Sequence, residues 1–270
     1  MKILSNAKIN LGLNIISKRL DGFHEIESIF IPIDFSDVLF IEKSKEFSFK
    51  SIGIQIQGDI KSNLCVRAYQ LLAADFDIEP VTILLDKKIP IGAGLGGGSS
   101  NAAFVLKAIN SLYKLNLDTE TLRNYASKLG SDCAFFIENK PALASGRGEI
   151  LKPIMFKLNC WCLLVYPNIH VSTQVAYSKV KPKQPEINLE QLIQNSKEGW
   201  QSTIKNDFEP SVFANYPLIN ELKQSIIEMG AFYSAMSGSG SSVFGFFNEK
   251  VDASILGDKY VVEQFPINIY

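Results

Sequence analysis

The sequence predicts an α+β protein built from two domains, and three patterns along the chain predict it. Residues 7–15 alternate between apolar and polar side chains, as in a strand that buries one face. Apolar residues between 102 and 113 recur at helical spacing, as in a helix that packs one face on a core. A second series of strands and helices follows Pro153, and 270 residues suffice for two domains. We therefore expect domains over 1–152 and 153–270.

The first half is expected to contain both strands and helices. Its strand-like runs are rich in β-branched and aromatic residues, whereas its helical runs repeat apolar residues every three or four positions. A serine at 99 or 100 is the expected N-cap of the second helix, and Gly130 is typical of a helix C-terminus. The expected strands cover 7–15, 28–33, 37–42, 46–57 and 81–85, and the expected helices cover 63–74, 102–113 and 119–129.

The second half repeats this mixture with elements of its own. Two prolines among lysines predict a loop over 181–188, and serines and glycines predict another over 237–242. The expected strands cover 158–166, 231–236 and 243–247, with a short helix and a last strand after them. The expected helices cover 172–179, 189–196 and 217–229.

The composition excludes several classes of protein. With 27 basic and 28 acidic residues the net charge is −1, which argues against a nucleic-acid partner bound through a broad basic field. Every apolar run is shorter than the roughly 18 residues that span a bilayer, so we expect no membrane partner and a cytoplasmic location. Of the four cysteines only Cys160 and Cys162 are close in sequence, and we expect all four to be buried, reduced thiols.

The segment from Pro90 to Ala103 carries the strongest functional signal. It holds five glycines in seven positions, then two serines and a helix-forming run. Glycines let a ligand approach the backbone, and a helix that begins after them directs free amides and a positive dipole end into the loop. The segment therefore predicts a phosphate site. Its expected contacts are Pro90, Gly92, Gly94, Leu95, Gly96, Gly97, Gly98, Ser99 and Ser100.

A kinase loop for ATP competes with three other interpretations of this segment, each of which fits less well. A Walker A loop needs a lysine directly before its serine, but Gly98 stands there. A dinucleotide fingerprint needs an acidic residue at the end of a second strand, whereas Asp118 directly precedes another helix and is typical of a cap. A purely structural turn is disfavoured because ordering five glycines costs much conformational entropy, with no ligand to offset that cost. A kinase loop that holds the phosphates of ATP remains.

The glycine-rich segment resembles the second signature motif of the GHMP kinases. Asn-Ala-Lys-Ile-Asn-Leu at 6–11 resembles the first motif, and Met-Ser-Gly-Ser-Gly-Ser-Ser-Val-Phe at 236–244 resembles the third. The three motifs occur in the family's order and cover the chain from end to end. The resemblance implies an N-terminal domain like domain 2 of ribosomal protein S5 and a ferredoxin-like C-terminal domain. It also implies ATP as the phosphoryl donor.

Further segments, at 19–25, 130–133 and 206–209, resemble one branch of that family. Its members phosphorylate the 2-hydroxyl of a cytidine-diphosphate-linked methylerythritol, a small molecule of the non-mevalonate route to isoprenoid precursors. The alternative is another small-molecule kinase of the family, of the mevalonate or homoserine type. Mg²⁺ is expected because the charge on the ATP phosphates must be neutralised. Its protein ligands and the oligomeric state are left unassigned.

The resemblance assigns catalysis to Lys8 and Asp132. Asp132 matches the catalytic aspartate, which would take the proton of the acceptor hydroxyl, although any aspartate near a helix start can also be an N-cap. Lys8 lies on the polar face of its strand, where a lysine often just faces solvent. As the family's lysine it would keep Asp132 ionised and help neutralise the transition state.

The remaining assignments concern the two substrates. Asn10 shares a strand face with Lys8 and is expected to bind the acceptor. Phe23 and Tyr177 match two aromatics that sandwich the cytosine, with the phenylalanine and tyrosine exchanged, and His24 would hydrogen-bond its edge. Each of these rings is also what a packed core would use. Two more residues, Lys87 and Asn63, match positions that contact the nucleotide base and ribose.

Overall fold

The computed structural model of the chain describes residues 1–257 and 259–270, which divide into two compact units. The first unit consists of Met1–Ala7, Phe35–Ile91 and Gly96–Lys140, and the second of Lys8–Asp34, Gly92–Leu95 and Pro141–Tyr270. These units are discontinuous, unlike the two continuous ranges predicted. The reason is that two long strands, β1 (Lys2–Lys18) and β2 (His24–Lys43), contribute residues to both units.

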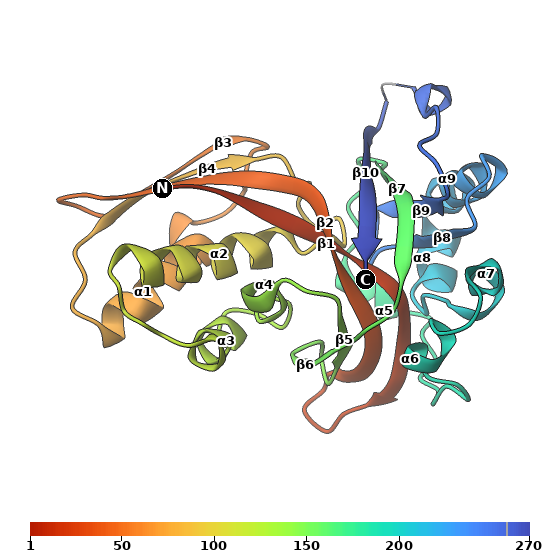
Figure 1. Ribbon diagram of the computed structural model, residues 1–270, viewed down its shortest axis with the longest axis horizontal. Coiled ribbons are helices and arrows are strands. Elements are labelled where there is room, and N and C mark those ends of the chain that lie inside the picture. Colours follow the sequence, from red (N-terminus) through yellow and green to blue (C-terminus); the bar gives the residue numbers. More distant parts are fainter. Residues whose placement is uncertain (258) are drawn as a thin grey trace. The chain divides into compact units, whose positions relative to one another are not determined.

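The first unit is a sheet with helices along one face (Figure 1). Its strand β4 (Val81–Lys87) pairs antiparallel with the second half of β2 and parallel with β3 (Ser48–Gly53). Alternate residues of β4 are buried, so one face of this strand packs on the interior of the unit. The helical segments are η1 (Ile60–Ser62), α1 (Leu64–Asp75), α2 (Gly97–Leu112), α3 (Thr119–Ser127) and α4 (Phe135–Glu138).

The second unit contains an antiparallel sheet of strands in the order β10-β7-β9-β8. Its strands are β7 (Leu158–Tyr166), β8 (Tyr233–Met236), β9 (Val243–Phe247) and β10 (Val261–Ile269). In addition, β5 (Ala142–Ser145) pairs with the first half of β2 and with β6 (Ile150–Pro153). The helical segments are α5 (Thr173–Tyr177), α6 (Leu189–Leu192), η2 (Lys197–Gly199), α7 (Trp200–Thr203), α8 (Glu209–Asn215), α9 (Pro217–Glu228) and η3 (Ser254–Leu256).

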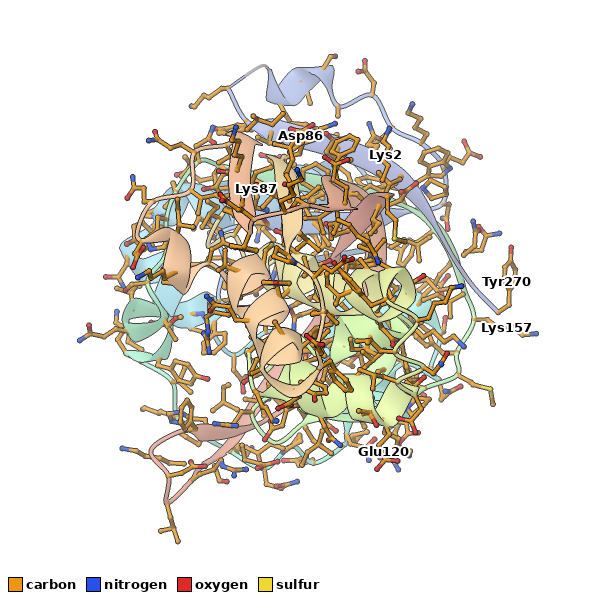
Figure 2. All side chains as sticks on the ribbon, turned by 90° about the vertical axis from the view of Figure 1, so that its left-hand side faces the viewer. Lys2, Asp86, Lys87, Glu120, Lys157 and Tyr270 are labelled. Atoms are coloured by element: carbon orange, nitrogen blue, oxygen red, sulfur yellow. The ribbon has the colours of Figure 1, made fainter. Side chains whose placement is uncertain are left out.

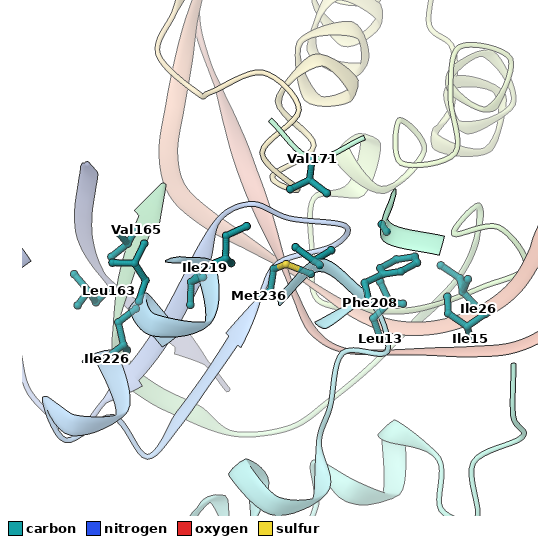
Figure 3. Packing of buried hydrophobic residues seen from close by; sticks show 14 of the residues in the cluster. Leu13, Ile15, Ile26, Leu163, Val165, Val171, Phe208, Ile219, Ile226 and Met236 are labelled. Atoms are coloured by element: carbon teal, nitrogen blue, oxygen red, sulfur yellow. The ribbon is translucent and has the colours of Figure 1, made fainter. Parts of the chain in front are cut away.

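One hydrophobic cluster joins these parts of the second unit (Figure 3). Leu13 and Ile15 come from β1, Leu163 from β7, Phe208 from the residue before α8, and Ile226 from α9. Burying side chains of this size stabilises the fold by roughly 1.5–3 kcal/mol each. The cluster therefore ties β1 to the antiparallel sheet of its own unit.

Two expectations about the whole chain can be compared with this structure. The four cysteines are free and buried, as predicted, and burial raises the pKa of Cys65 to about 12. Such thiols are protonated and unreactive at neutral pH. In the part of the chain that the structure describes, no helix has the length and apolar character needed to span a bilayer.

Candidate active site

The start of α2 provides free backbone amides. The helix begins at Gly97, after Gly96 in the left-handed conformation with φ of 69°, so neither Ser99 nor Ser100 is its N-cap, contrary to the prediction. Because the first intrahelical bond runs from Ser100 N to Gly96 O (2.9 Å), the amides of the three preceding residues lack helical acceptors. Glycine allows the helix to start this early, since it tolerates positive φ at position 96.

A buried ion pair lies directly behind this helix start. Lys87, at the end of β4 (Figure 2), donates from Nζ to Asp37 Oδ2 at 2.5 Å, and both side chains are almost fully buried. A Cβ added to Gly97 would lie 3.0 Å from Lys87 Nζ. Burial lowers the pKa of Lys87, and the charge of Asp37 opposes that effect. Lys87 was predicted to contact the nucleotide, but its ammonium is buried against the first residue of α2.

Asp37 satisfies all of its hydrogen-bonding capacity within the first unit. Its Oδ1 accepts from the amides of Lys88 and Ile89 at 2.7 and 2.8 Å. Its Oδ2 also accepts from Asn101 Nδ2 at 2.9 Å, in the second turn of α2. A buried carboxylate is tolerated when it is paired and fully hydrogen-bonded. Asp37 thus fixes the chain that leads from β4 into the glycine-rich segment.

Asp132 lies in a turn next to the start of α2. This turn precedes α4, whose N-cap is Ala134 without a side-chain bond, so Asp132 does not cap that helix. A Cβ added to Gly130, just before this turn, would lie 3.4 Å from Cys133 Sγ and 4.0 Å from Ser99 Oγ, in the first turn of α2. Burial raises the pKa of Cys133 to about 11, and the Ser99 hydroxyl opposes the rise. The first unit therefore brings a half-buried carboxylate close to the free amides of a helix.

In the second unit, Gly92–Leu95 is held by the third motif. Ser237 Oγ donates to Gly94 O at 2.9 Å, and Ser242 N donates to Ala93 O at 3.2 Å. Gly94 has φ of 78°, and a Cβ there would overlap the carbonyl oxygen of Ser237. Only glycine fits at this position, because a side chain would be strained and would also clash.

Lys8 and Asn10 are neighbours on one face of β1, as predicted. Lys8 Nζ donates to Asn10 Oδ1 at 2.6 Å and lies 4.6 Å from the ring centroid of Phe30. Asn10 Nδ2 donates to Ser28 Oγ at 2.8 Å, and Asn10 N donates to Ser237 Oγ. The Lys8 side chain is only 3% exposed, so it does not simply face solvent. The bond to Asn10 therefore fixes the orientation of a buried ammonium.

The three predicted cytosine contacts cluster near the start of β2. His24 and Tyr177 stack with ring centroids 4.5 Å apart and an interplanar angle of 22°. Burial lowers the pKa of His24, and the charge of Lys18 acts in the same direction, so its imidazole is neutral near pH 7. A neutral imidazole offers one donor and one acceptor. Phe23 lies on the adjacent turn, with the Arg147 guanidinium 4.8 Å from its ring centroid.

The site also contains residues to which the sequence assigned no role. Asp37 lies outside the three motifs, whereas Asn101 and Ser237 lie within the second and third, and all three hold the glycine-rich segment through bonds between residues distant along the chain. Asn63, a predicted nucleotide contact, is the N-cap of α1 and accepts from Cys65 N at 2.9 Å. Asp118 caps α3 by accepting from Thr121 N, as predicted, and the fully described stretch between α2 and α3 contains no strand.

A helix that starts with free amides after a glycine-rich segment is typical of phosphate-binding proteins. The chain matches the family models of the N-terminal domain of GHMP kinases over residues 63–140 and of their C-terminal domain over 184–266. It therefore belongs to the GHMP kinase family, which confirms the predicted fold class.

The most similar proteins found belong mainly to one branch of this family. A Bacteroides fragilis protein named 4-diphosphocytidyl-2-C-methyl-D-erythritol kinase is 48% identical over 248 residues, which cover 90% of each chain. A protein of the same name from Chlorobium phaeobacteroides is 39% identical, over 97% of this chain and 93% of its own. A solved structure of 4-(cytidine 5'-diphospho)-2C-methyl-D-erythritol kinase is 36% identical with a TM-score of 0.78, over 91% of this chain and 90% of that one. A Methanococcus jannaschii mevalonate kinase, at 18% identity and a TM-score of 0.65, shares the fold.

Gly98 offers a direct test of the phosphate-binding role. A Cβ there would meet only Leu64 Cδ1 at 3.8 Å, an ordinary contact, and alanine is favoured over glycine in helices. Gly98→Ala should therefore fold normally, while its methyl group obstructs the approach of a phosphate. We expect ATP affinity, measured by calorimetry, to fall by about 10- to 100-fold.

The matched control for this variant is Gly199→Ala. Gly199 also has open space around its Cβ position and a φ of −87°, but it lies at the start of α7. It should bind ATP as the wild type does, and thermal melting should show both variants folded. Unchanged ATP affinity in Gly98→Ala would contradict phosphate binding at the start of α2.

Proposed function

We propose that this chain transfers the γ-phosphoryl group of ATP to the 2-hydroxyl of 4-diphosphocytidyl-2-C-methyl-D-erythritol. The products are ADP and the 2-phosphate, in the non-mevalonate route to isoprenoid precursors. The observation that carries the proposal is the position of the Asp132 turn beside the start of α2, where a Cβ added to Gly130 would lie 3.4 Å from Cys133 Sγ and 4.0 Å from Ser99 Oγ. The relatives at 39–48% identity support the choice of acceptor.

The chemistry requires a proton acceptor and neutralisation of the transferring phosphoryl group. We propose that Asp132 accepts the proton of the 2-hydroxyl. The amides at the start of α2 and the backbone of Gly92–Leu95 would hold the phosphate oxygens by hydrogen bonds. Lys8, held by Asn10, would supply positive charge to the same transfer and orient the acceptor hydroxyl.

Nucleotide binding draws on further residues of the first unit. Lys87 would act through its bond to Asp37, which supports the start of α2, and Asn63 would contribute at the start of α1. Ser100 Oγ is buried and has no hydrogen-bond partner among the described residues, so this hydroxyl is free to contact Mg²⁺ or a phosphate oxygen. The metal would neutralise charge between the β- and γ-phosphates. Its placement beside Ser99 and Ser100 is part of the proposal.

A neutral His24 stacked on Tyr177 suits recognition of a pyrimidine. The imidazole can exchange hydrogen bonds with the cytosine edge, while aromatic faces of Phe23 and Tyr177 offer stacking. Asn10 would bind the sugar-alcohol part of the same molecule. These contacts distinguish a cytidine-linked acceptor from mevalonate or homoserine, which lack a ring.

The deciding experiment measures ADP release with three acceptors under identical conditions. We expect turnover with the cytidyl substrate in the presence of Mg²⁺ and none above background with mevalonate or homoserine. Turnover on either small acid, without turnover on the cytidyl substrate, would overturn the proposed acceptor and favour the other kinases of the family. A cytoplasmic site for the reaction remains a prediction.

Replacing His24 tests how the acceptor is recognised. His24→Ala removes the hydrogen-bonding edge and one stacked ring, so the KM for the cytidyl substrate should rise by roughly 10- to 100-fold. The KM for ATP should stay unchanged, which serves as the internal control. Equal changes in both constants would mean that His24 supports the fold rather than the cytosine.

A further inference from the structure

The segment Asn206–Glu209, one of the motifs singled out in the sequence, touches three different parts of the proposed acceptor site. We propose that it is a positioning segment, in which Phe208 sets the ring of Tyr177 and Asn206 sets the loop that contacts Asn10. The inference rests on the proposed function, because the groups it positions are those assigned to the cytidyl substrate. All of these residues belong to the second unit.

Phe208 supports the ring of Tyr177. The two rings meet edge to face, with centroids 4.7 Å apart and an interplanar angle of 77°. Tyr177 in turn stacks on His24, so the three rings form a continuous row. Phe208 is only 4% exposed and lies beside Leu13 in the hydrophobic cluster (Figure 3). Phe208 contacts Tyr177 from the side of the hydrophobic cluster, so we assign it a positioning role through that ring.

Asn206 holds the loop of the third motif. Its Nδ2 donates to both Met236 O and Gly238 O at 2.8 Å, while its Oδ1 accepts from Phe208 N at 3.0 Å. The residue between those two carbonyls is Ser237, whose hydroxyl accepts from Asn10 N. One buried amide therefore determines both the position of Ser237 and the start of the Phe208 main chain.

The other two residues anchor the segment. Asp207 N donates to Leu13 O, and Asp207 Oδ2 accepts from Ile15 N at 2.7 Å, which fixes the segment to β1. Glu209 Oε1 accepts from Met236 N at 2.9 Å, and its Oε2 accepts from Lys223 Nζ at 2.6 Å. Because all four residues make specific bonds or ring contacts, a shift of the segment would move the aromatic row and the Ser237 loop together.

The test replaces the ring of Phe208 while keeping an apolar side chain. Phe208→Leu and Phe208→Met should each raise the KM for the cytidyl substrate by about 3- to 10-fold, since aromatic contacts of this kind have that magnitude. The KM for ATP should not change. Phe208→Met is included because a flexible side chain fills more of the vacated space than leucine does.

Phe247→Leu is the matched control. Phe247 belongs to the same cluster, is equally buried at 3% exposed, and lies on β9. Assays are run below the melting temperature of every variant. If Phe247→Leu raised the acceptor KM as much as Phe208→Leu, loosening of the core would explain the effect and the proposal would be wrong. An unchanged acceptor KM in both Phe208 variants would also overturn it.

The proposed function can fail separately. A wild-type protein that does not use the cytidyl substrate would overturn the acceptor assignment and, with it, the role of the segment toward that acceptor. If the wild type uses the cytidyl substrate and the Phe208 variants have the same KM for it, only the positioning role is overturned. Calorimetric titration with cytidine 5'-diphosphate gives a second readout, in which the Phe208 variants should bind 3- to 10-fold more weakly, about the same ratio as in KM.

Discussion

Asp132→Asn should lower kcat by about 10²–10⁴ while the protein stays folded and binds ATP. The amide has nearly the shape of the carboxylate but cannot accept the proton of the acceptor hydroxyl. Asp132 lies in the turn before α4 and does not cap that helix, so the substitution removes no helix cap. Steady-state ADP release measures kcat, and thermal melting reports whether the fold is intact.

Asp118→Asn is the control for that variant. Asp118 is also a carboxylate of the first unit, but it caps α3 through a bond from Thr121 N at 2.8 Å. Asparagine caps helices about as well as aspartate, so this variant should keep wild-type kcat and stability. If Asp132→Asn kept a near-normal kcat as well, Asp132 would not be the base.

Lys8→Gln should also lower kcat strongly, by about 10²–10³. Glutamine can still hydrogen-bond but carries no charge to stabilise the phosphoryl group in the transition state. The ammonium is buried, bonded to Asn10 Oδ1 and close to Phe30, so it is held in one orientation before any ligand arrives. Because Lys2 is an exposed lysine of the same strand, Lys2→Gln should be indistinguishable from the wild type.

A double variant shows whether Lys8 and Asp132 act on one step. Residues that function as a unit give losses far from additive, so the double variant should lose little more than the worse single variant. Losses that multiply would indicate that the two residues contribute independently. This measurement matters because the two residues belong to different compact units.

Local patterns predicted most elements of the fold. The alternation around Ile9 and the helical spacing after Gly98 each depend on one buried face, which the sequence records directly. The predicted strand near the chain start is longer in the structure, Lys2–Lys18, because its polar face is also largely buried. The alternation of apolar and polar residues indicates one buried face, but it does not reveal that other parts of the protein also cover the polar face.

The errors occur where tertiary pairing outweighs local preference. The sequence predicted separate strands over 28–33 and 37–42, yet β2 is continuous from His24 to Lys43. Pro32 lies between the segment paired with β5 and the segment paired with β4, where no amide is required for either ladder. The strand β5, Ala-Leu-Ala-Ser, is too short and too rich in alanine to be recognised from its sequence.

The sequence named the residues expected to contact a ligand, and these assignments stay predictions, but it did not indicate the residues that support them. Glycines and the serines after them indicate a phosphate loop whatever surrounds them. The partner of Lys87 is Asp37, fifty positions away along the chain, and no local pattern connects the two residues. The same holds for Asn206 and Gly238, whose bond depends on a loop conformation set by the whole second unit.

The division of the strands has a practical consequence for dissecting this protein. A fragment that starts at Pro153 would lack Leu13 and Ile15, which β1 supplies to the hydrophobic cluster of the second unit. A fragment that ends before Pro153 would keep those side chains but leave them without the strands they cover. Expression of either half alone would therefore yield a piece with an incomplete interior, so separate roles are better assigned by point substitutions in the intact chain than by truncation.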